Sequence, residues 1–360
     1  MPRDGARAVD EASASRRFGR DDDLATPSGS RVARHHRALG TPVADAAAPA
    51  PTHETLAAKT SIDLDMIKRL FAMALLVVSA SAMAAPSGVP AQTLLWTVAS
   101  KSRTLYLTGD TQVLLPSDYP LPARVVKAFN DSGELVLEGD PGVDSTHVSA
   151  LIRQTGVLPA SERLTGILDP RDARLVQQVA EQLGVPLEKV EPLRPWLAAL
   201  VLSNAANAKL GCVPARQETN HFYALARSRR LPITPLETAD TQLGLFAKMP
   251  EDLQIAWLTV TARRWMDAGG QREAERARIV RAWRSGDIDV LAKVLLRQFD
   301  QHPGLYAALV AQRNDAWLST LEAKLEQPGP PVFVLVGAGH LVGSDNLVSL
   351  LTKAGYRVAR

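Results

Sequence analysis

Two stretches of this 360-residue sequence share one pattern: an apolar run, a glycine and, three positions later, a polar residue. In the later stretch, VFVLVGAGH, the step runs from Gly337 to His340, and in the earlier one, LYLTGDTQ, it runs from Gly109 to Gln112. Imidazole is a good ligand for Mn, Co or Zn, whereas the neutral glutamine amide is a much weaker one. The pattern suggests a metal site with two ligand positions, only one of which is still a histidine.

Carboxylate residues follow other predicted strands. Asp110 lies between Gly109 and Gln112, Glu138 closes the run ELVLE, and Glu237 closes LPITPLE. In α/β proteins ligands bind at the carboxyl ends of strands, so these side chains should gather near His340. If the chain stays extended, Asp110 and Gln112 share one face of their strand. The set indicates a metal site or a hydrolase, or only a tight strand-to-helix turn in which His340 bonds to backbone.

The hydrophobic periodicity predicts the elements that position these residues. Alternating apolar residues predict a β-hairpin over 93–109, and further strands are predicted at 134–138, 231–238, 330–339 and 356–359. From about Asp144 to Glu326 apolar residues recur mainly at i, i+3 and i+4, which is typical of helices. We therefore expect an α/β (α+β) fold, with a central sheet formed from the N- and C-terminal segments and a large helical middle layer.

Composition argues against a nucleic-acid-binding protein and against structures built on several cysteines. The sequence has 41 Lys and Arg against 38 Asp and Glu, close to balance, and a nucleic-acid-binding protein needs a concentrated basic face. Its single cysteine, Cys212, excludes an internal disulfide and a cysteine-rich zinc site. A lone thiol is usually a small buried apolar group.

The N-terminal part of the sequence predicts export. Residues 1–65 are rich in Ala, Arg, Asp, Pro and Ser, so they should be disordered, and we interpret them as a mis-assigned upstream extension. Residues 66–84 have a basic start, an apolar run and a small-x-small end at Ala82–Ala84, which is typical of a signal peptide. Residues 85–360 would then form the mature domain in the periplasm, with no integral membrane span. The alternative is that the segment stays as a membrane anchor.

From about Leu94 to Val358 the sequence resembles the TraB/GumN family, which includes the Tiki proteins. The resemblance rests on motifs in a fixed order: Glu138 at the end of a strand, L-E-T at Leu236–Thr238, R-N-x-x-W at Arg313, Asn314 and Trp317, and G-A-G-H-L-x-G at Gly337–Gly343. For members with both histidines it implies a metal-dependent, peptidase-like activity, with the histidines and the glutamate around a divalent cation. The substrate or partner would be a peptide or protein.

This sequence departs from the family pattern at two positions. Gln112 stands where the family has the histidine of an early G-x-x-H, and Glu218-Thr219-Asn220 stands where it commonly has G-x-D. Replacing this histidine should remove much of the metal affinity of a site that has few protein ligands. Even the loss of a residue that only hydrogen-bonds to a ligand lowers metal affinity about 10–100-fold.

Two hypotheses from different classes follow. The first is a hydrolase in which Glu138 and His340 are ligands or acid/base groups and Asp110 or Gln112 completes the set. Arg313 would then stabilise developing negative charge, and the motif residues Asn314 and Glu237 would belong to the same catalytic site. The second is an inactive member that holds no metal and binds a peptide or partner without cleaving it. A further alternative is that the intact motif residues are only structural.

Overall fold

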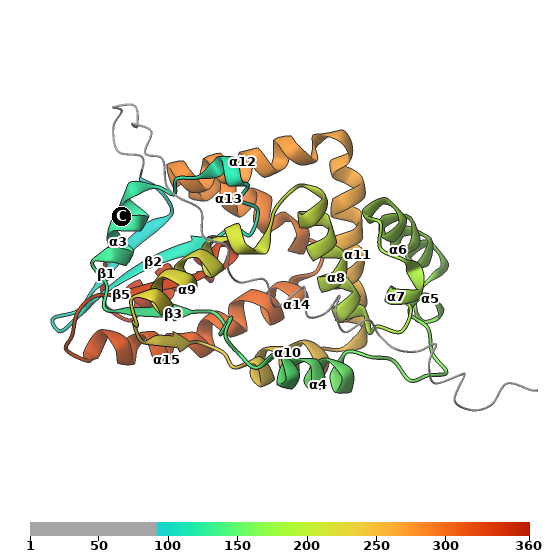
Figure 1. The fold of residues 1–360 in the computed structure, drawn as a ribbon, viewed down its shortest axis with the longest axis horizontal. Helices are drawn as coiled ribbons and strands as arrows, with labels where there is room; N and C mark the ends of the chain where they lie inside the picture. Colours follow the sequence, from blue (N-terminus) through green and yellow to red (C-terminus); the bar gives the residue numbers. More distant parts are fainter. Residues whose placement is uncertain (1–91) are drawn as a thin grey trace, which may run out of the picture. The chain divides into compact units, whose positions relative to one another are not determined.

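The computed structural model of the protein describes residues 92–360 (Figure 1). Its six-stranded sheet is formed by β1 (Leu95–Ala99), β2 (Thr104–Asp110), β3 (Glu134–Leu137), β4 (Ile233–Pro235), β5 (Val332–Gly337) and β6 (Arg357–Ala359). The order across the sheet is β4-β3-β5-β2-β1-β6. Strands from the beginning and the end of the described chain therefore lie side by side, which confirms the predicted α/β sheet.

The parallel part of the sheet defines the edge at which a site can form. Strands β4, β3, β5 and β2 run parallel, whereas β1 is antiparallel to both β2 and β6. The β1–β2 pair is the predicted hairpin, with Trp96 opposite Leu107. Strand β5 is almost continuously buried, because parallel strands are covered on both faces. Asp110 lies opposite Gly337, so the polar residues after these strands meet at one edge.

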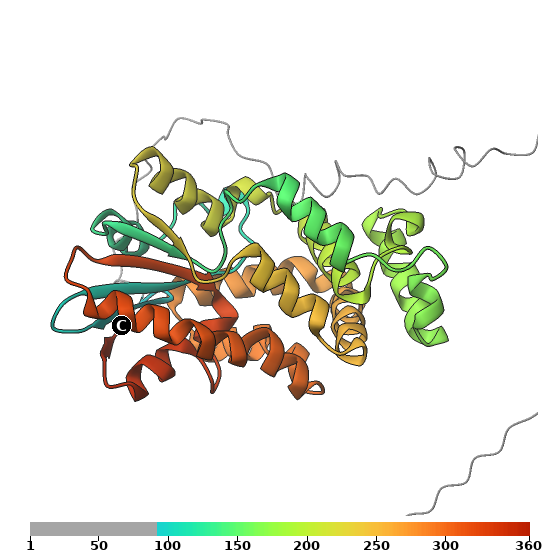
Figure 2. The ribbon, with the colours of Figure 1, turned by 90° about the horizontal axis from the view of Figure 1, so that it is seen from below.

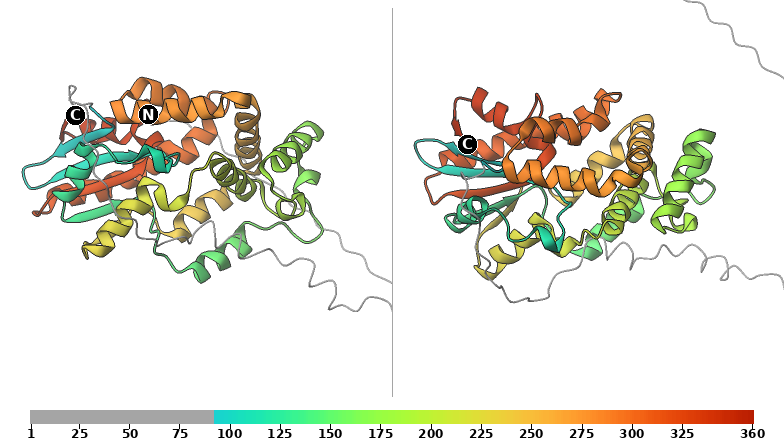
Figure 3. Two further views of the ribbon diagram at one scale, coloured as in Figure 1. Left: turned by 45° about the horizontal axis from the view of Figure 1, so that its top comes forward. Right: turned by 90° about the horizontal axis from the view of Figure 1, so that it is seen from above.

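The helical middle is also confirmed. The helices are α3 (Ala123–Asn130), α4 (Ser145–Thr155), α5 (Leu164–Ile167), α6 (Pro170–Leu183), α7 (Leu187–Val190), α8 (Pro195–Lys209), α9 (Glu218–Ser228), α10 (Ala239–Lys248), α11 (Glu251–Ala268), α12 (Arg272–Ser285), α13 (Ile288–Leu295), α14 (Pro303–Tyr306), α15 (Gln312–Glu326) and α16 (Leu347–Lys353). In Figure 2, α9 (olive) and α15 (orange-red) lie on opposite sides of the sheet. The green helices α4 to α8 gather beyond one end of the strands (Figure 3).

Local signals set individual boundaries. Helix α6 begins where the Asp169 side chain accepts hydrogen bonds from two backbone N–H groups, with Pro170 in the first turn, and it ends at Gly184 with φ 71°. Strand β4 is shorter than predicted, with three residues in place of the span 231–238. Pro232 and Pro235 explain this difference, because proline cannot donate a hydrogen bond to a neighbouring strand.

Buried apolar side chains form two clusters. One surrounds the sheet and includes Phe129, Phe222 and Phe333, whose rings contact one another. The other joins the middle helices and includes Trp196 and Trp265. The core therefore has a part built on the sheet and a part built on helices.

The predicted extension 1–65 and signal segment 66–84 lie outside the described residues. Within residues 92–360, no helix is both long enough and apolar enough to cross a membrane. Cys212 is buried, as expected of a lone thiol.

Candidate functional site

Three turns at the carboxyl edge of the sheet hold the predicted polar residues. Glu138 directly follows β3, Glu237 comes shortly after β4, and His340 lies in a short 3-10 helix after β5. Helix α15 presents Arg313 and Asn314, both buried, to the same edge. The structure thus brings these five residues together, while their catalytic and metal-binding roles stay predictions.

The Arg313 guanidinium links the two glutamates. Its Nε and Nη2 atoms donate to the two oxygens of Glu237, at 2.8 Å each, and Nη2 also donates to Glu138 Oε1 at 2.5 Å. Trp317 Nε1 donates to Glu237 Oε1 at 2.9 Å. The side chains of Arg313 and Glu237 are each only 6% exposed. This is a buried, two-pronged ion pair in which both oxygens of Glu237 are occupied.

Glu138 is the more accessible carboxylate, with 26% of its side chain exposed. Its Oε1 also accepts a long bond of 3.4 Å from Gln242, and its Oε2 accepts from the Gly337 N–H at 3.1 Å. A Cβ at position 337 would lie 3.3 Å from that Oε2, so the glycine allows the carboxylate to approach the end of β5. On its other side, Glu138 Oε2 lies 4.0 Å from His340 Nε2.

The hydrogen bonds of Asn314 determine which nitrogen of His340 carries the proton. Asn314 Nδ2 donates to the Asp345 carbonyl at 2.7 Å, which turns the amide oxygen toward His340 Nδ1 at 2.8 Å. Since an amide oxygen only accepts, Nδ1 must be the protonated nitrogen. His340 Nε2 therefore keeps a lone pair, which accepts a long bond of 3.4 Å from Arg313 Nη1 and lies 4.0 Å from Glu138 Oε2.

The charges at this site follow from burial and from Arg313. Burial lowers the pKa of His340 to about 4; the Glu138 carboxylate opposes the shift and Arg313 adds to it. Burial raises the pKa of Glu138, but the charge of Arg313 outweighs it and brings the pKa to about 2. At neutral pH a neutral imidazole thus lies beside an ionised carboxylate.

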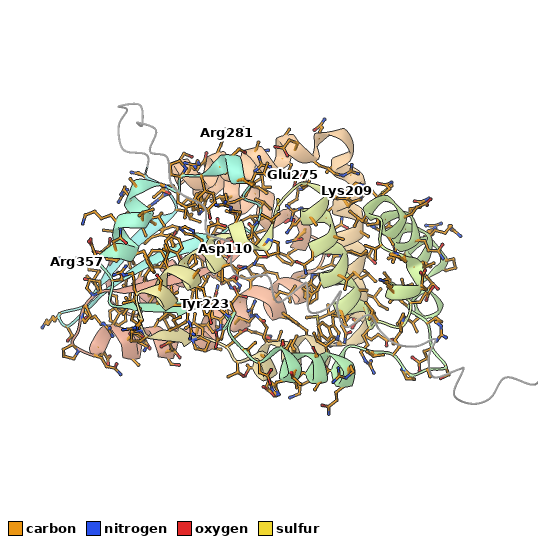
Figure 4. All side chains as sticks on the ribbon, viewed as in Figure 1. Asp110, Lys209, Tyr223, Glu275, Arg281 and Arg357 are labelled. Carbon is orange, nitrogen blue, oxygen red and sulfur yellow. The ribbon has the colours of Figure 1, made fainter. Side chains whose placement is uncertain are left out.

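The turn after β2 corrects one expectation. Strand β2 ends at Asp110, and Gln112 has a φ of 57°, so the two residues do not share a strand face. Asp110 Oδ1 accepts from the Gln112 N–H at 2.8 Å, while Oδ2 accepts from the N–H of Thr219 at 3.2 Å and from its hydroxyl. The Gln112 side chain is exposed. Figure 4 labels Asp110 between the sheet and α9.

Glu218 is a residue of this region that sequence analysis did not place there. It is fully buried at the start of α9, and its Oε1 accepts from the N–H and hydroxyl of Thr111 at 3.1 and 2.9 Å. Burial and the nearby Asp110 carboxylate raise its pKa well above the ordinary range. The signal in the sequence is that Glu218 begins the Glu218-Thr219-Asn220 step, which stands where the family pattern commonly has G-x-D.

The predicted metal ligands do not form a complete site in this arrangement. His340 Nε2 and Glu138 Oε2 make a pair of donors, but Asp110 is engaged by Thr219 and Gln112 is exposed. Over the described residues, no three His, Cys, Asp or Glu side chains are disposed to hold a metal ion. Catalytic metal sites typically use three protein ligands. The nearby Arg313 also engages the Nε2 lone pair of His340, through Nη1 at 3.4 Å.

Two known proteins are similar in sequence to most of this chain. YbaP of Escherichia coli (strain K12) is 29% identical over 261 residues, which cover 69% of this chain and 88% of YbaP. YbaP of Shigella flexneri is 30% identical over the same length and coverage. No solved structure matches the chain. The sequence model of the TraB/PrgY/gumN family matches residues 94–360, which include every residue of the site, and the chain therefore belongs to that family.

Proposed function

We propose that this chain is an exported member of the family that binds a peptide or protein partner and does not hydrolyse it. The observation that carries the proposal is the double pairing of Arg313 with Glu138 and Glu237. One cation is paired with both carboxylates at the edge of the sheet, so each carboxylate has a partner within the protein. The arrangement serves to hold the ends of β3 and β4 against α15.

The acid–base properties of the site also support a binding role. A general acid or base works best when its pKa lies near the working pH. The pKa of about 2 for Glu138 and of about 4 for His340 make both groups weak bases at neutral pH. The missing third ligand and the exposed Gln112 point in the same direction.

Export is supported by the sequence of residues 66–84. Lys68 and Arg69, the apolar run after them and the small residues Ala82 and Ala84 have the order of a signal peptide. The periplasm is the compartment that this proposal gives to the mature chain.

A hydrolase is the second candidate, and the orientation of His340 favours it. Its unprotonated Nε2 lies 4.0 Å from Glu138 Oε2, and a water between them would donate to Glu138 and, once the long contact from Arg313 Nη1 is released, to Nε2. Arg313 would then stabilise negative charge developing on the substrate.

The test compares the full chain with Gln112→His, using Gln112→Asn as the matched control. Each protein is incubated with a peptide library and with Mn²⁺, Co²⁺ or Zn²⁺; metal content is measured by mass spectrometry and cleavage by chromatography. We expect no cleavage and no stoichiometric metal in the natural sequence or in Gln112→Asn. Gln112→His should gain metal, because it restores the donor of the family pattern. Cleavage by the natural sequence that disappears in His340→Ala would replace the binding proposal by the hydrolase.

A further inference from the structure

A pocket of about 580 Å³ lies between α9 and the edge strand β4, outside the site described above. It is lined by Asp140, Tyr223, Arg227, Arg230, Leu231 and Ile233. Its lining combines two cations, one carboxylate, a phenol and two apolar side chains. The lining is mainly polar and carries two positive charges against one negative, so it suits a small anionic group beside an apolar one.

The two arginines of the pocket are free to bind a ligand. Among the described residues, neither Arg227 nor Arg230 has a hydrogen-bond or ion-pair partner for its guanidinium, whereas the neighbouring Arg229 bonds to the carbonyls of α3 and lies over the ring of Phe129. Tyr223 and Arg227 are four residues apart on α9, so they share one face of the helix. Arg230 follows the helix with a φ of 57°. Paired guanidinium groups can hold a carboxylate through several charge-assisted hydrogen bonds.

The other side of the pocket is formed by the loop after β3. Asp140 is two residues after Glu138, and its Oδ1 accepts from the Gly142 N–H at 2.7 Å. Tyr223 closes against this loop so tightly that a Cβ at Gly142 would lie 1.9 Å from the phenol oxygen. The pocket is thus lined on one side by the loop that carries Glu138, and Figure 4 shows Tyr223 on α9 beside β3.

The pocket and the Glu138 side chain belong to opposite faces of the sheet. Ile233, in the pocket, is paired with Leu135 of β3, whose neighbour Phe333 contacts Phe222 of α9. Glu138 lies three residues after Leu135 and bonds to Arg313 of α15 on the other face. The pocket is therefore a site separate from the Glu138 site.

We propose that this pocket binds the carboxyl-terminal end of a peptide whose last side chain is apolar. Arg227 and Arg230 take the terminal carboxylate, and Leu231 and Ile233 contact the last side chain. The proposal deepens the peptide-binding function proposed above by naming the end of the peptide that is recognised, and it does not depend on whether the peptide is cleaved.

The experiment measures binding of the tripeptide Ala-Ala-Leu to the full chain by titration calorimetry, beside its C-terminal amide and Ala-Ala-Asp. We expect the free acid to bind at least about tenfold more tightly than the amide, because a charged hydrogen-bonded group is lost. Arg227→Gln and Arg230→Gln should each weaken the acid about tenfold and leave the amide unchanged. Arg281→Gln is the matched control, since Arg281 is exposed on α12 and lies apart from the pocket (Figure 4).

Each contrary result has a definite meaning. Equal binding of acid and amide, or no binding of the acid, would overturn carboxylate recognition. Equal binding of Ala-Ala-Leu and Ala-Ala-Asp would overturn the apolar preference, and competition by inorganic phosphate at the same concentration would make the pocket a general anion site. Cleavage of the bound tripeptide would contradict the non-hydrolytic function while leaving this pocket assignment intact.

Discussion

At the scale of single residues, Arg313 decides the chemistry of the site. A guanidinium presents several donors in one plane, and here it satisfies both oxygens of Glu237 and one oxygen of Glu138. The same charge helps to keep Glu138 ionised and His340 neutral. The residues that a sequence motif marks as catalytic therefore also form a buried electrostatic unit.

Removing this cation should destabilise the protein strongly. In Arg313→Met, Glu237 would remain buried without its partner, and we expect a loss of about 3–5 kcal/mol in the free energy of unfolding. Urea denaturation at pH 7 measures it. Lys127→Met, which removes an exposed ion pair with Asp131, is the control and should leave the midpoint unchanged. A loss below about 1 kcal/mol in Arg313→Met would show that the pair does not hold the site together.

The hydrogen bond from His340 to Asn314 can be tested by placing a negative charge on the acceptor side chain. Asn314→Asp places a carboxylate where the amide oxygen lies, 2.8 Å from Nδ1, and should raise the pKa of His340 from its value of about 4. Histidine-selective NMR titration gives this value directly. The control, Asn130→Asp, lies at the end of α3, at the opposite edge of the sheet, and should not move it. An unchanged pKa of His340 in Asn314→Asp would contradict the contact between these two side chains.

At the scale of elements, close contact between strand ends positions the site. Strands β2 and β5 end side by side, and Gly109 makes this possible. A Cβ at that position would lie 2.7 Å from Leu94 Cδ2 and 2.8 Å from the Ala338 backbone. The apolar strand interior thus fixes the turns that carry Asp110 and His340.

A methyl group at this contact should disturb the sheet. We expect Gly109→Ala to lower the free energy of unfolding by about 1–3 kcal/mol, because the backbone of the next turn must shift. Gly166→Ala is a matched control in α5, where an added Cβ meets nothing within 4 Å, and it should be neutral or slightly stabilising. Equal effects of the two substitutions in urea denaturation would contradict the tight packing of β2 against β5.

A second ion-pair network joins elements at the opposite edge of the sheet. Glu134 at the start of β3 contacts Arg103, Lys324 of α15 and Thr234 of β4. Burial raises the pKa of Glu134, but the bonds from Lys324 and Thr234 and the charge of Arg103 lower it below its usual value. A carboxylate with a lowered folded pKa stabilises the fold above its unfolded pKa and loses that contribution as the pH falls.

The pH dependence of stability should show this contribution. The difference in unfolding free energy between the natural sequence and Glu134→Gln should be constant above about pH 5 and shrink as the pH falls through about 4.3 and below. Glu162→Gln, an exposed position before α5, is the control. A difference that grows on acidification would refute the assigned sign.

At the scale of the whole molecule, the site lies where the two apolar clusters meet. Leu309 and Val310, in the π-helical turn before α15, belong to the helical cluster, whereas Trp317 and Leu321 belong to the sheet cluster. Arg313 lies between them. Helix α15 and the turn before it therefore connect both parts of the core and carry the cation that joins β3 and β4.

The proposed export is also a property of the whole chain. We expect the protein recovered from the periplasm to begin at Ala85, and mass spectrometry of its N-terminal peptide measures this. Ala84→Arg should block processing, because the small residue before the cleavage point is lost. Met83→Leu changes only the middle position and should be processed normally. Periplasmic protein that still contains residues 66–84 would support the membrane-anchor alternative.

Much of the fold could be predicted from the sequence because its signals are local. The alternation in β1 and β2, the apolar run of β5 and the helical periodicity between them depend on residues near one another in the chain. The motif residues at strand ends could be found in the same way, since parallel strands bring their carboxyl ends to one edge. Strand β4 is shorter than the predicted span because proline, at positions 232 and 235, cannot donate a hydrogen bond to a neighbouring strand.

Only the tertiary structure decided what these residues do to one another. Arg313 and Glu138 are 175 residues apart in sequence, and no periodicity or spacing signals their hydrogen bond. The burial of Glu218 beside Asp110 likewise depends on how α9 packs against the end of β2. The sequence by itself determined the elements and the family, because both are carried by short-range patterns. The charge state of the site and the engagement of Asp110 by Thr219 arise from long-range packing, which only the folded chain contains.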